Sequence, residues 1–234
     1  MKRSEALVGV PAALAAALLL AAVPAGAEPP QFGIGLFGGY NFYSMNDVND
    51  DIDNTNAVFG TSIDKLKSGI GFGGGLRVHT SPSLLLSLDY ERLTGSTTGS
   101  GTDGALVYNA NLDLPANAIV AGVSYYFPSA SKTRLGLSGG IGYYMADGSL
   151  KLTASDGINS VTLTGDASGN GIGFHGAGAL EMSLSPTVHL DAMVGYRVAK
   201  TGDLEVDGST LSNYSAEWSG LMSRAGFSLY FGSH

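Results

Sequence analysis

Large apolar residues alternate with small or polar residues in eight segments of the chain. In the first segment Phe32, Ile34 and Leu36 share one face, and Gly33 and Gly35 lie on the other. A period of two indicates a β-strand, because successive side chains of a strand point to opposite faces. The eight predicted strands cover residues 32–43, 69–79, 84–91, 119–127, 135–145, 171–182, 188–198 and 221–231.

The connections between these strands differ in length. Short connections alternate with long, polar ones along the chain. The short ones are residues 80–83, 128–133 and 185–187, and the long ones are residues 44–67, 94–118, 146–170 and 201–217. Barrels of the bacterial outer membrane have short turns on the periplasmic side and long loops outside. The even number of strands then predicts that both chain ends lie on the periplasmic side.

The long connection at residues 146–170 contains two strand-like runs, Leu150-Lys151-Leu152 and Val161-Thr162-Leu163. Residues 156–159 between them have the composition of a turn. We therefore expect the fifth and sixth strands to continue above the membrane as a hairpin. A protruding strand of this kind is a candidate for binding a surface partner by edge pairing.

A weak internal repeat supports the strand count. Residues 35–39 resemble residues 136–140, and residues 121–127 resemble residues 225–231 at a similar offset. Residues 69–72 and 171–174 are related in the same way. The barrel is therefore expected to consist of two four-strand units in tandem, from duplication or from common selection on strands.

The charged residues of the predicted strands fall on the face of small residues. They are Arg77, Asp89, Glu91, Glu181, Asp191, Arg197 and Arg224, and Arg92 is the main exception. The apolar face, which carries aromatic residues near both strand ends, is then expected to meet hydrocarbon, with the charges inside a closed barrel. A soluble barrel of lipocalin shape is the alternative.

The interior of an eight-stranded barrel is narrow enough for side chains to fill it. Because buried charges need partners, we expect the three arginines to pair with the four carboxylates in a structural network that closes the barrel. A narrow path for ions or small solutes through this network is the competing interpretation.

The composition excludes several classes of protein. The absence of cysteine rules out disulfides and thiolate metal sites, and a net charge of −8 argues against a nucleic-acid partner. Lys2 and Arg3, an apolar run at residues 7–20 and the tripeptide at residues 25–27 predict a secretory signal peptide over residues 1–27. Residues 28–234 then form the mature barrel domain. An uncleaved membrane anchor is the alternative.

Several motif matches are better explained by the strand pattern. Gly-x-Gly-x-x-Gly begins at Gly33, Gly69 and Gly171, but no predicted helix follows, as a dinucleotide site would require. The nucleophile-like Ser138 lies within a strand rather than at a strand-to-helix turn. The acidic run at residues 47–53 lacks the glycine and glutamate of a calcium loop, although looser divalent-ion binding stays open. We expect no catalytic residue, no metal ligand and no cofactor.

The alternating strands, the segments at residues 87–91 and 124–127, and the C-terminal strand ending Phe227-Ser228-Leu229-Tyr230-Phe231 resemble the OmpA/OmpX-like outer-membrane β-barrel family. The resemblance covers essentially the whole mature chain. It implies an all-β, eight-stranded, antiparallel up-and-down transmembrane barrel in the outer membrane of a Gram-negative cell. It also implies that the barrel contacts outer-membrane lipid and lipopolysaccharide, and that the barrel-assembly machinery recognises the C-terminal strand. The protein is then expected to be a monomer.

We therefore expect a non-enzymatic protein that acts through its four long loops, as a structural element of the cell envelope or by binding an extracellular ligand. A narrow porin-like channel is the alternative. A lipid-modifying hydrolase is a third possibility, which needs a histidine near the outer leaflet. His79 and His189 lie toward the predicted periplasmic end, and His175 faces the predicted lumen.

Overall fold

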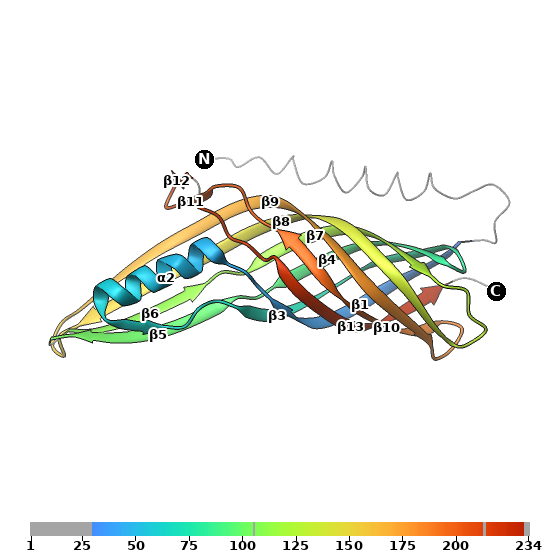
Figure 1. Cartoon of the computed structure of the whole chain (residues 1–234), viewed down its shortest axis with the longest axis horizontal. Coiled ribbons are helices and arrows are strands. Elements are labelled where there is room, and N and C mark those ends of the chain that lie inside the picture. The colour runs from blue at the N-terminus through green and yellow to red at the C-terminus, as the bar shows by residue number, and fades with distance from the viewer. Residues whose placement is uncertain (1–29, 105, 213, 232–234) are drawn as a thin grey trace.

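Eight antiparallel strands close into a barrel in the computed structural model, which describes residues 30–104, 106–212 and 214–231. Each strand pairs with its neighbours around the ring, and β13 pairs with β1 to complete it (Figure 1). In ring order the strands are β1 (Gln31–Phe42), β3 (Ser68–Ser81), β4 (Leu84–Leu93), β7 (Ala116–Tyr126), β8 (Thr133–Ser155), β9 (Ser160–Ser183), β10 (Val188–Ala199) and β13 (Gly220–Phe231). The predicted eight-stranded barrel is confirmed. The predicted signal peptide at residues 1–27 lies outside the described residues.

The two ends of the barrel differ. The short turns lie at one end, together with the start of β1 and the end of β13, where Phe32 pairs with Phe231 (right in Figure 1). We call this the short-turn end and the opposite one the long-loop end. The repeated segments lie on β1 and β8, on β3 and β9, and on β7 and β13, so each pair sits half a turn apart around the ring.

A second sheet continues from the long-loop end. β8 and β9 run on as a hairpin, and β6 (Leu106–Asp113), β5 (Ser96–Asp103) and β2 (Thr61–Ile63) add to the edge of β8 in that order. This outer sheet, made of β2, β5, β6 and the parts of β8 and β9 at residues 147–155 and 160–170, projects away from the barrel (Figure 1). The predicted continuation of the hairpin is confirmed.

The other long connections, which we expected to be loops, also hold secondary structure. Residues 94–118 contain β5 and β6, because the extended edge of β8 supplies partners for their backbone groups. Residues 44–67 contain β2 and helix α2, and residues 201–217 contain β11 (Leu204–Val206) and β12 (Ser209–Leu211). β11 pairs with β9 at Ala167 and Ser168.

Helix α2 (Asn46–Phe59) contacts β2 and β5 of the outer sheet. Val48 and Ile52, one turn apart, are its buried apolar residues, and Gly60 ends it in the left-handed conformation that glycine adopts without strain. No helix in the described ranges is both long enough and apolar enough to cross a membrane.

A packed apolar cluster closes the barrel at the long-loop end. The cluster contains inward-facing residues from the strand ends and residues of the long connections. Trp218 is one of its members and is only 1% exposed. We call the cluster the outer cap. It consists of Tyr43, Met45, Val48, Ile52, Leu66, Leu93, Leu114, Ala116, Ala118, Val120, Tyr144, Ala146, Ala199, Leu204, Ala216 and Trp218. Backbone bonds from Ser44 to Ser219 and from Met45 to Glu217 join the segments that form it.

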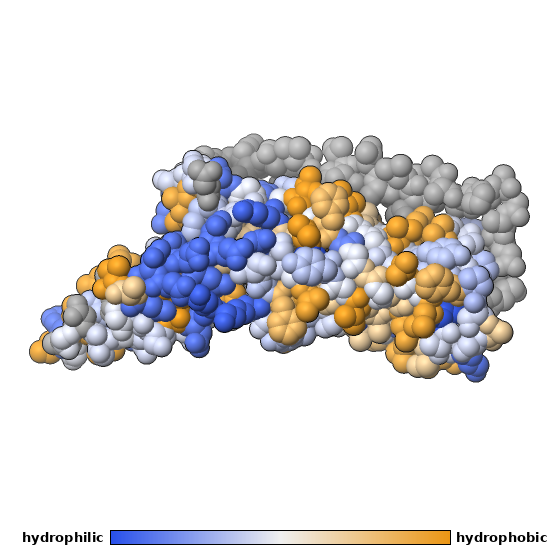
Figure 2. All heavy atoms as spheres, in the orientation of Figure 1, coloured by the Kyte–Doolittle hydropathy of each residue, from blue (hydrophilic) through white to orange (hydrophobic). Residues whose placement is uncertain are grey.

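The outward face of the barrel is apolar, and the outward face of the outer sheet is polar. On β8 the outward series runs through Leu135, Ile141 and Met145, and then changes at Asp147 to serine, lysine and threonine. β9 makes the same change between Ile172 and Asn170, and Asn170 pairs with Met145, two positions from Asp147. Figure 2 shows hydrophobic residues over the barrel and a hydrophilic area over the region of α2. This inversion marks one boundary of the apolar band.

Candidate functional site

Three groups of charged residues occupy the lumen. In the middle group Asp89 on β4 accepts hydrogen bonds from Arg77 on β3 and, at 3.2 Å, from Arg224 on β13. The guanidinium of Arg224 also lies 4.5 Å from the ring centroid of Phe37. Glycine provides the space, because a Cβ atom at Gly35 would lie 3.1 Å from the Arg77 guanidinium.

Toward the long-loop end, Arg197 on β10 donates to both carboxylate oxygens of Glu91 on β4, at 2.9 and 2.7 Å. These two strands lie on opposite walls of the barrel. Both side chains are buried, so the pair crosses the lumen directly below the outer cap. The ring of Tyr144, a residue of that cap, lies 5.7 Å from the Arg197 guanidinium.

At the short-turn end, Glu181 on β9 is the centre of the third group. His79 Nε2 on β3 and His189 Nδ1 on β10 each lie 3.1 Å from one of its carboxylate oxygens. Arg134 on β8 donates to the same carboxylate and to the carbonyl of Pro82. Glu181 and both histidines are buried, although they lie close to the open rim of the barrel.

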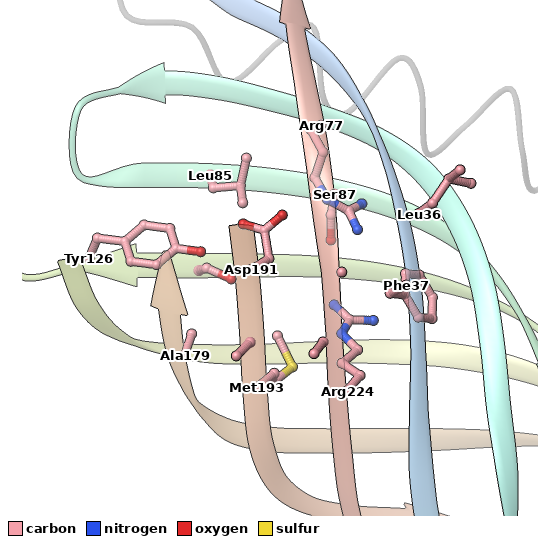
Figure 3. A pocket seen from close by; sticks show the side chains of 14 residues that line it. Leu36, Phe37, Arg77, Leu85, Ser87, Tyr126, Ala179, Asp191, Met193 and Arg224 are labelled. Carbon is pink, nitrogen blue, oxygen red and sulfur yellow. The ribbon is translucent and has the colours of Figure 1, made fainter. Parts of the chain in front are cut away.

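Asp191 lies between the middle group and the Glu181 group. It accepts a hydrogen bond from Ser228 of the neighbouring strand β13. Figure 3 shows its carboxylate and the guanidinium groups of Arg77 and Arg224 around a small cavity. The cavity has a volume of about 30 Å³, which is enough to hold water beside these charged groups.

All seven charged residues predicted for the lumen lie there, but they do not form one continuous set of pairs. Arg77, Asp89 and Arg224 meet one another, and Arg197 meets Glu91, whereas Glu181 pairs with none of the other six. Its partners Arg134, His79 and His189 were not among the predicted residues. The alternation could have identified them, because all three lie on the face of small residues that points into the lumen.

The outer sheet offers a second candidate site on its polar face. A groove of about 480 Å³ lies over β5, β6 and β8. It is lined by Thr98, Gly99, Ser100, Asn109, Ala110, Asn111, Lys151 and Thr153. Hydroxyl and amide groups dominate this surface, and neighbouring Thr153 and Thr162 hydroxyls are 3.2 Å apart.

The two edges of the outer sheet differ. On β2, the side chain of Asn56 binds the backbone of Ile63 twice, with its amide donating at 3.0 Å and its oxygen accepting at 2.8 Å. This side chain therefore occupies the edge of β2. On β9, residues 160–165 pair only with β8 among the described residues, so the other side of this segment is open.

Two acidic groups tie the long connections together outside the barrel wall. The hydrogen bonds from the Ser215 hydroxyl at 2.6 Å and the Ser215 backbone amide at 3.0 Å lower the pKa of Asp47 on α2. Burial raises the pKa of Tyr214, and the nearby carboxylate of Asp51 adds to this effect. The start of α2 is thereby fixed to the segment that precedes β13.

A model of the outer membrane protein beta-barrel domain matches residues 12–216. No curated protein matches the chain in sequence. Among solved structures, a major outer membrane protein from Thermus thermophilus is similar, with 15% identity, a TM-score of 0.52, and coverage of 87% of this chain and 100% of that one. OprG from Pseudomonas aeruginosa has 12% identity, a TM-score of 0.48, and coverage of 89% and 99%. Neisserial surface protein A has 17% identity, a TM-score of 0.40, and coverage of 87% and 100%.

Proposed function

The chain belongs to the family of outer membrane protein beta-barrel domains, and from this premise we propose that it is a non-enzymatic, non-conducting anchor that presents the outer sheet to a partner at the cell surface. In this proposal the short-turn end is periplasmic and the outer sheet stands above the outer leaflet. The partner is an extended segment of another surface protein, which adds to the open edge of β9.

The open edge of β9 is the observation that carries the proposal. Residues 160–165 contain no charged residue and no proline, which are the usual devices that protect an exposed edge. Val161 and Leu163 are 63% and 64% exposed and point to the same face. An added strand would gain backbone hydrogen bonds along this edge and apolar contacts with these two side chains.

The filled lumen supports an anchor rather than the alternative of a narrow channel. The Arg197–Glu91 pair crosses the interior, and the outer cap lies beyond it on the path outward. A hydrated ion would have to displace both, and the cavity beside Asp191 has a volume of only about 30 Å³. We therefore expect no conductance steps from the refolded protein in planar lipid bilayers. Regular, voltage-stable steps would favour the channel.

The histidines support a non-enzymatic role. His79 and His189 are buried around Glu181 inside the barrel, and His175 also points inward from β9. A lipid-modifying hydrolase needs a histidine with a nucleophile where lipid can reach them. Under this proposal the purified barrel leaves phospholipid vesicles unhydrolysed.

The apolar outward band is proposed to contact outer-membrane lipid, and the polar outer sheet above it the sugars of lipopolysaccharide. The C-terminal strand β13 is proposed to be read by the barrel-assembly machinery. Its outward residues Phe227, Leu229 and Phe231 form the pattern on which this expectation rests. The barrel strands all find partners within one chain, in keeping with a monomer.

The binding proposal can be tested with a phage-displayed library of random peptides, selected against the full protein in lipid nanodiscs. We expect enriched peptides with alternating apolar residues. Their binding should fall at least tenfold in a Val161→Lys, Leu163→Lys variant. Leu150→Lys is the matched control, because it adds a lysine to the same face, 48% exposed, on the neighbouring strand. No enrichment, or equal losses in both variants, would remove the edge as the binding site.

A further inference from the structure

Two imidazoles and one carboxylate meet at the short-turn end of the lumen. One ligand atom each from His79, Glu181 and His189 can be chosen so that all three lie within 4.8 Å of one another. They come from β3, β9 and β10, so His79 reaches its partners from the opposite wall of the barrel. Each histidine lies 3.1 Å from a different oxygen of the Glu181 carboxylate, close to the spacing of about 3.3 Å between ligand atoms on a tetrahedral ion with bonds of 2.0–2.1 Å.

The hydrogen bonding of the cluster is incomplete. His189 Nδ1 is buried and faces the Glu181 carboxylate at 3.1 Å, but it has no hydrogen-bond partner among the described residues. His79 faces the carboxylate with Nε2, and its Nδ1 is buried without a hydrogen-bond partner among the described residues. Both histidines are only 7% exposed. Because buried polar atoms are normally satisfied, an ion held between His189 Nδ1 and the carboxylate would satisfy both groups.

We propose that His79, Glu181 and His189 form a binding site for one Zn²⁺ ion at the periplasmic rim of the barrel. Two histidine nitrogens and one carboxylate oxygen are ligands that Zn²⁺ prefers, and three protein ligands leave a fourth position for water. The inference is independent of the proposed partner at the outer sheet, which lies at the other end of the barrel.

The positive charge of Arg134 repels a cation at this site. The contacts of its guanidinium with other groups reduce this repulsion. Arg134 donates to Oε1 of Glu181, the oxygen that His189 Nδ1 also faces, while His79 approaches Oε2. It also donates to the Pro82 carbonyl and lies 5.1 Å from the ring centroid of Tyr126. The guanidinium thus holds the carboxylate through Oε1 and leaves Oε2 beside His79, and hydrogen bonds to metal-binding carboxylates are common.

A second carboxylate contributes negative charge near the site. Asp191 interacts electrostatically with both Glu181 and His189, and its Oδ1 is buried without a hydrogen-bond partner in the described chain. Its remaining contact is the hydrogen bond from Ser228. Together, Glu181 and Asp191 offset two of the three positive charges that Arg134 and the ion bring to this end of the lumen.

The ion would connect opposite walls of the barrel. β3 and β9 are not neighbours in the ring and share no backbone ladder, and the side-chain hydrogen bond of His79 with Glu181 joins them across the lumen. A bound Zn²⁺ holds these walls together and should raise the thermal midpoint of the refolded protein, because the ion binds the folded state.

Zinc binding should be measured on the refolded full barrel in detergent, by isothermal titration and by competition with a chromophoric chelator. We expect one Zn²⁺ per barrel and an upward shift of the thermal midpoint. His79→Gln and His189→Gln should each weaken binding at least tenfold and abolish the shift. His175→Gln is the matched control, because it removes an inward-facing histidine of β9 outside the cluster, and it should retain both.

Folding of each variant is checked by the change in gel mobility on heating. If the variants do not fold, Co²⁺ added to the wild-type protein gives an independent answer, since four-coordinate Co²⁺ absorbs visible light far more strongly than hexahydrated Co²⁺. A weak, hexahydrate-like spectrum, no saturable Zn²⁺ binding, or equal affinity in the folded His79 and His189 variants would overturn the proposal.

Discussion

The guanidinium of Arg197 and the carboxylate of Glu91 meet across the full width of the barrel, with two hydrogen bonds of 2.9 and 2.7 Å. Arg197 is 2% exposed and Glu91 4% exposed. Removal of one partner would leave the other charge buried without its counter-ion, which is costly in a medium of low dielectric constant.

We expect Arg197→Met or Glu91→Leu alone to lower the free energy of unfolding by about 3–5 kcal/mol, measured by urea unfolding in lipid vesicles. The double variant should recover most of this loss, because apolar residues of similar volume can replace a buried pair. The matched control is Lys65→Met, which breaks the exposed 2.6 Å pair with Asp53 and should cost about 0–1 kcal/mol. Equal effects of the buried and exposed variants would contradict this account.

The outer cap predicts the behaviour of the single tryptophan. Trp218 is 1% exposed, so its fluorescence in the folded barrel should resist quenching by acrylamide and become accessible in urea. Trp218→Ala should destabilise the protein by about 3–5 kcal/mol, since it leaves a large cavity. Ile158→Ala, at a residue 92% exposed on the hairpin tip, should have almost no effect. Rapid quenching in the folded state would show that the cap is open.

The change of polarity along β8 predicts where a charge is tolerated on its outward face. Ile141→Lys lies near the middle of the apolar band and should cost about 2–4 kcal/mol in lipid vesicles. Ser149→Lys lies on the same face of the same strand, beyond the change at Asp147, and should cost little. A similar cost at both positions would place the membrane boundary elsewhere.

The contact of Asp47 with Ser215 predicts a response to acid. The folded pKa of Asp47 lies below its ordinary value of 3.8, mainly because of the hydrogen bond from the Ser215 hydroxyl. A carboxylate with a lowered folded pKa stabilises the folded state above its ordinary pKa, and this contribution is lost as the pH falls through the lowered value. Ser215→Ala should therefore raise the pKa of Asp47 toward 3.8, as measured by NMR of the carboxyl carbon.

The same spectra contain a control for this measurement. Hydrogen bonds from the backbone amides of Asn159 and Ile158 lower the pKa of Asp156 in the hairpin turn. Ser215→Ala does not touch that turn, so the titration of Asp156 should stay as in the wild type. A shift of both groups would indicate a general rearrangement rather than loss of one hydrogen bond.

The barrel could be predicted from the sequence because the bilayer imposes a simple rule on each strand. Every strand needs one apolar face, so positions such as Leu36 and Val194, 57% and 66% exposed, show a strict period of two. The family expected from this pattern is confirmed, as is the continuation of the hairpin at residues 150–163.

Strands β2, β5 and β6 of the outer sheet could not be predicted from the sequence, because they form only beside their neighbouring strands. β5 reads Ser-Thr-Thr-Gly-Ser-Gly-Thr-Asp, which has neither alternation nor apolar content. It is a strand only because β6 lies beside it, and β6 in turn needs the edge of β8. The acidic residues that resembled a calcium loop belong to helix α2. Among its described side chains the buried apolar ones are Val48 and Ile52, which is too weak a pattern to predict a helix.

The lumen residues were predicted by face, but their pairing was not. His79 and Glu181 are separated by 102 positions, and Glu91 and Arg197 by 106. Two charged residues can pair across the lumen only if they lie at the same height along the barrel axis. This height depends on the register of every strand pair around the ring, which the alternation of residues does not determine. Arg134 was missed because it lies next to a short turn, although it shares the inward face with Gly136 and Ser138.

The side chain of Asn56 has a consequence for assembly. Since it occupies the backbone groups of Ile63, a sheet that recruits a strand at β9 cannot recruit another at β2. Head-to-tail stacking through β2 and β9 would need both edges to be free, and in the described outer sheet the edge of β2 is occupied at Ile63. Association through β2 and β9 should therefore stop at a single added strand, so the proposed display of the outer sheet at the cell surface would not lead to polymerisation through these two edges.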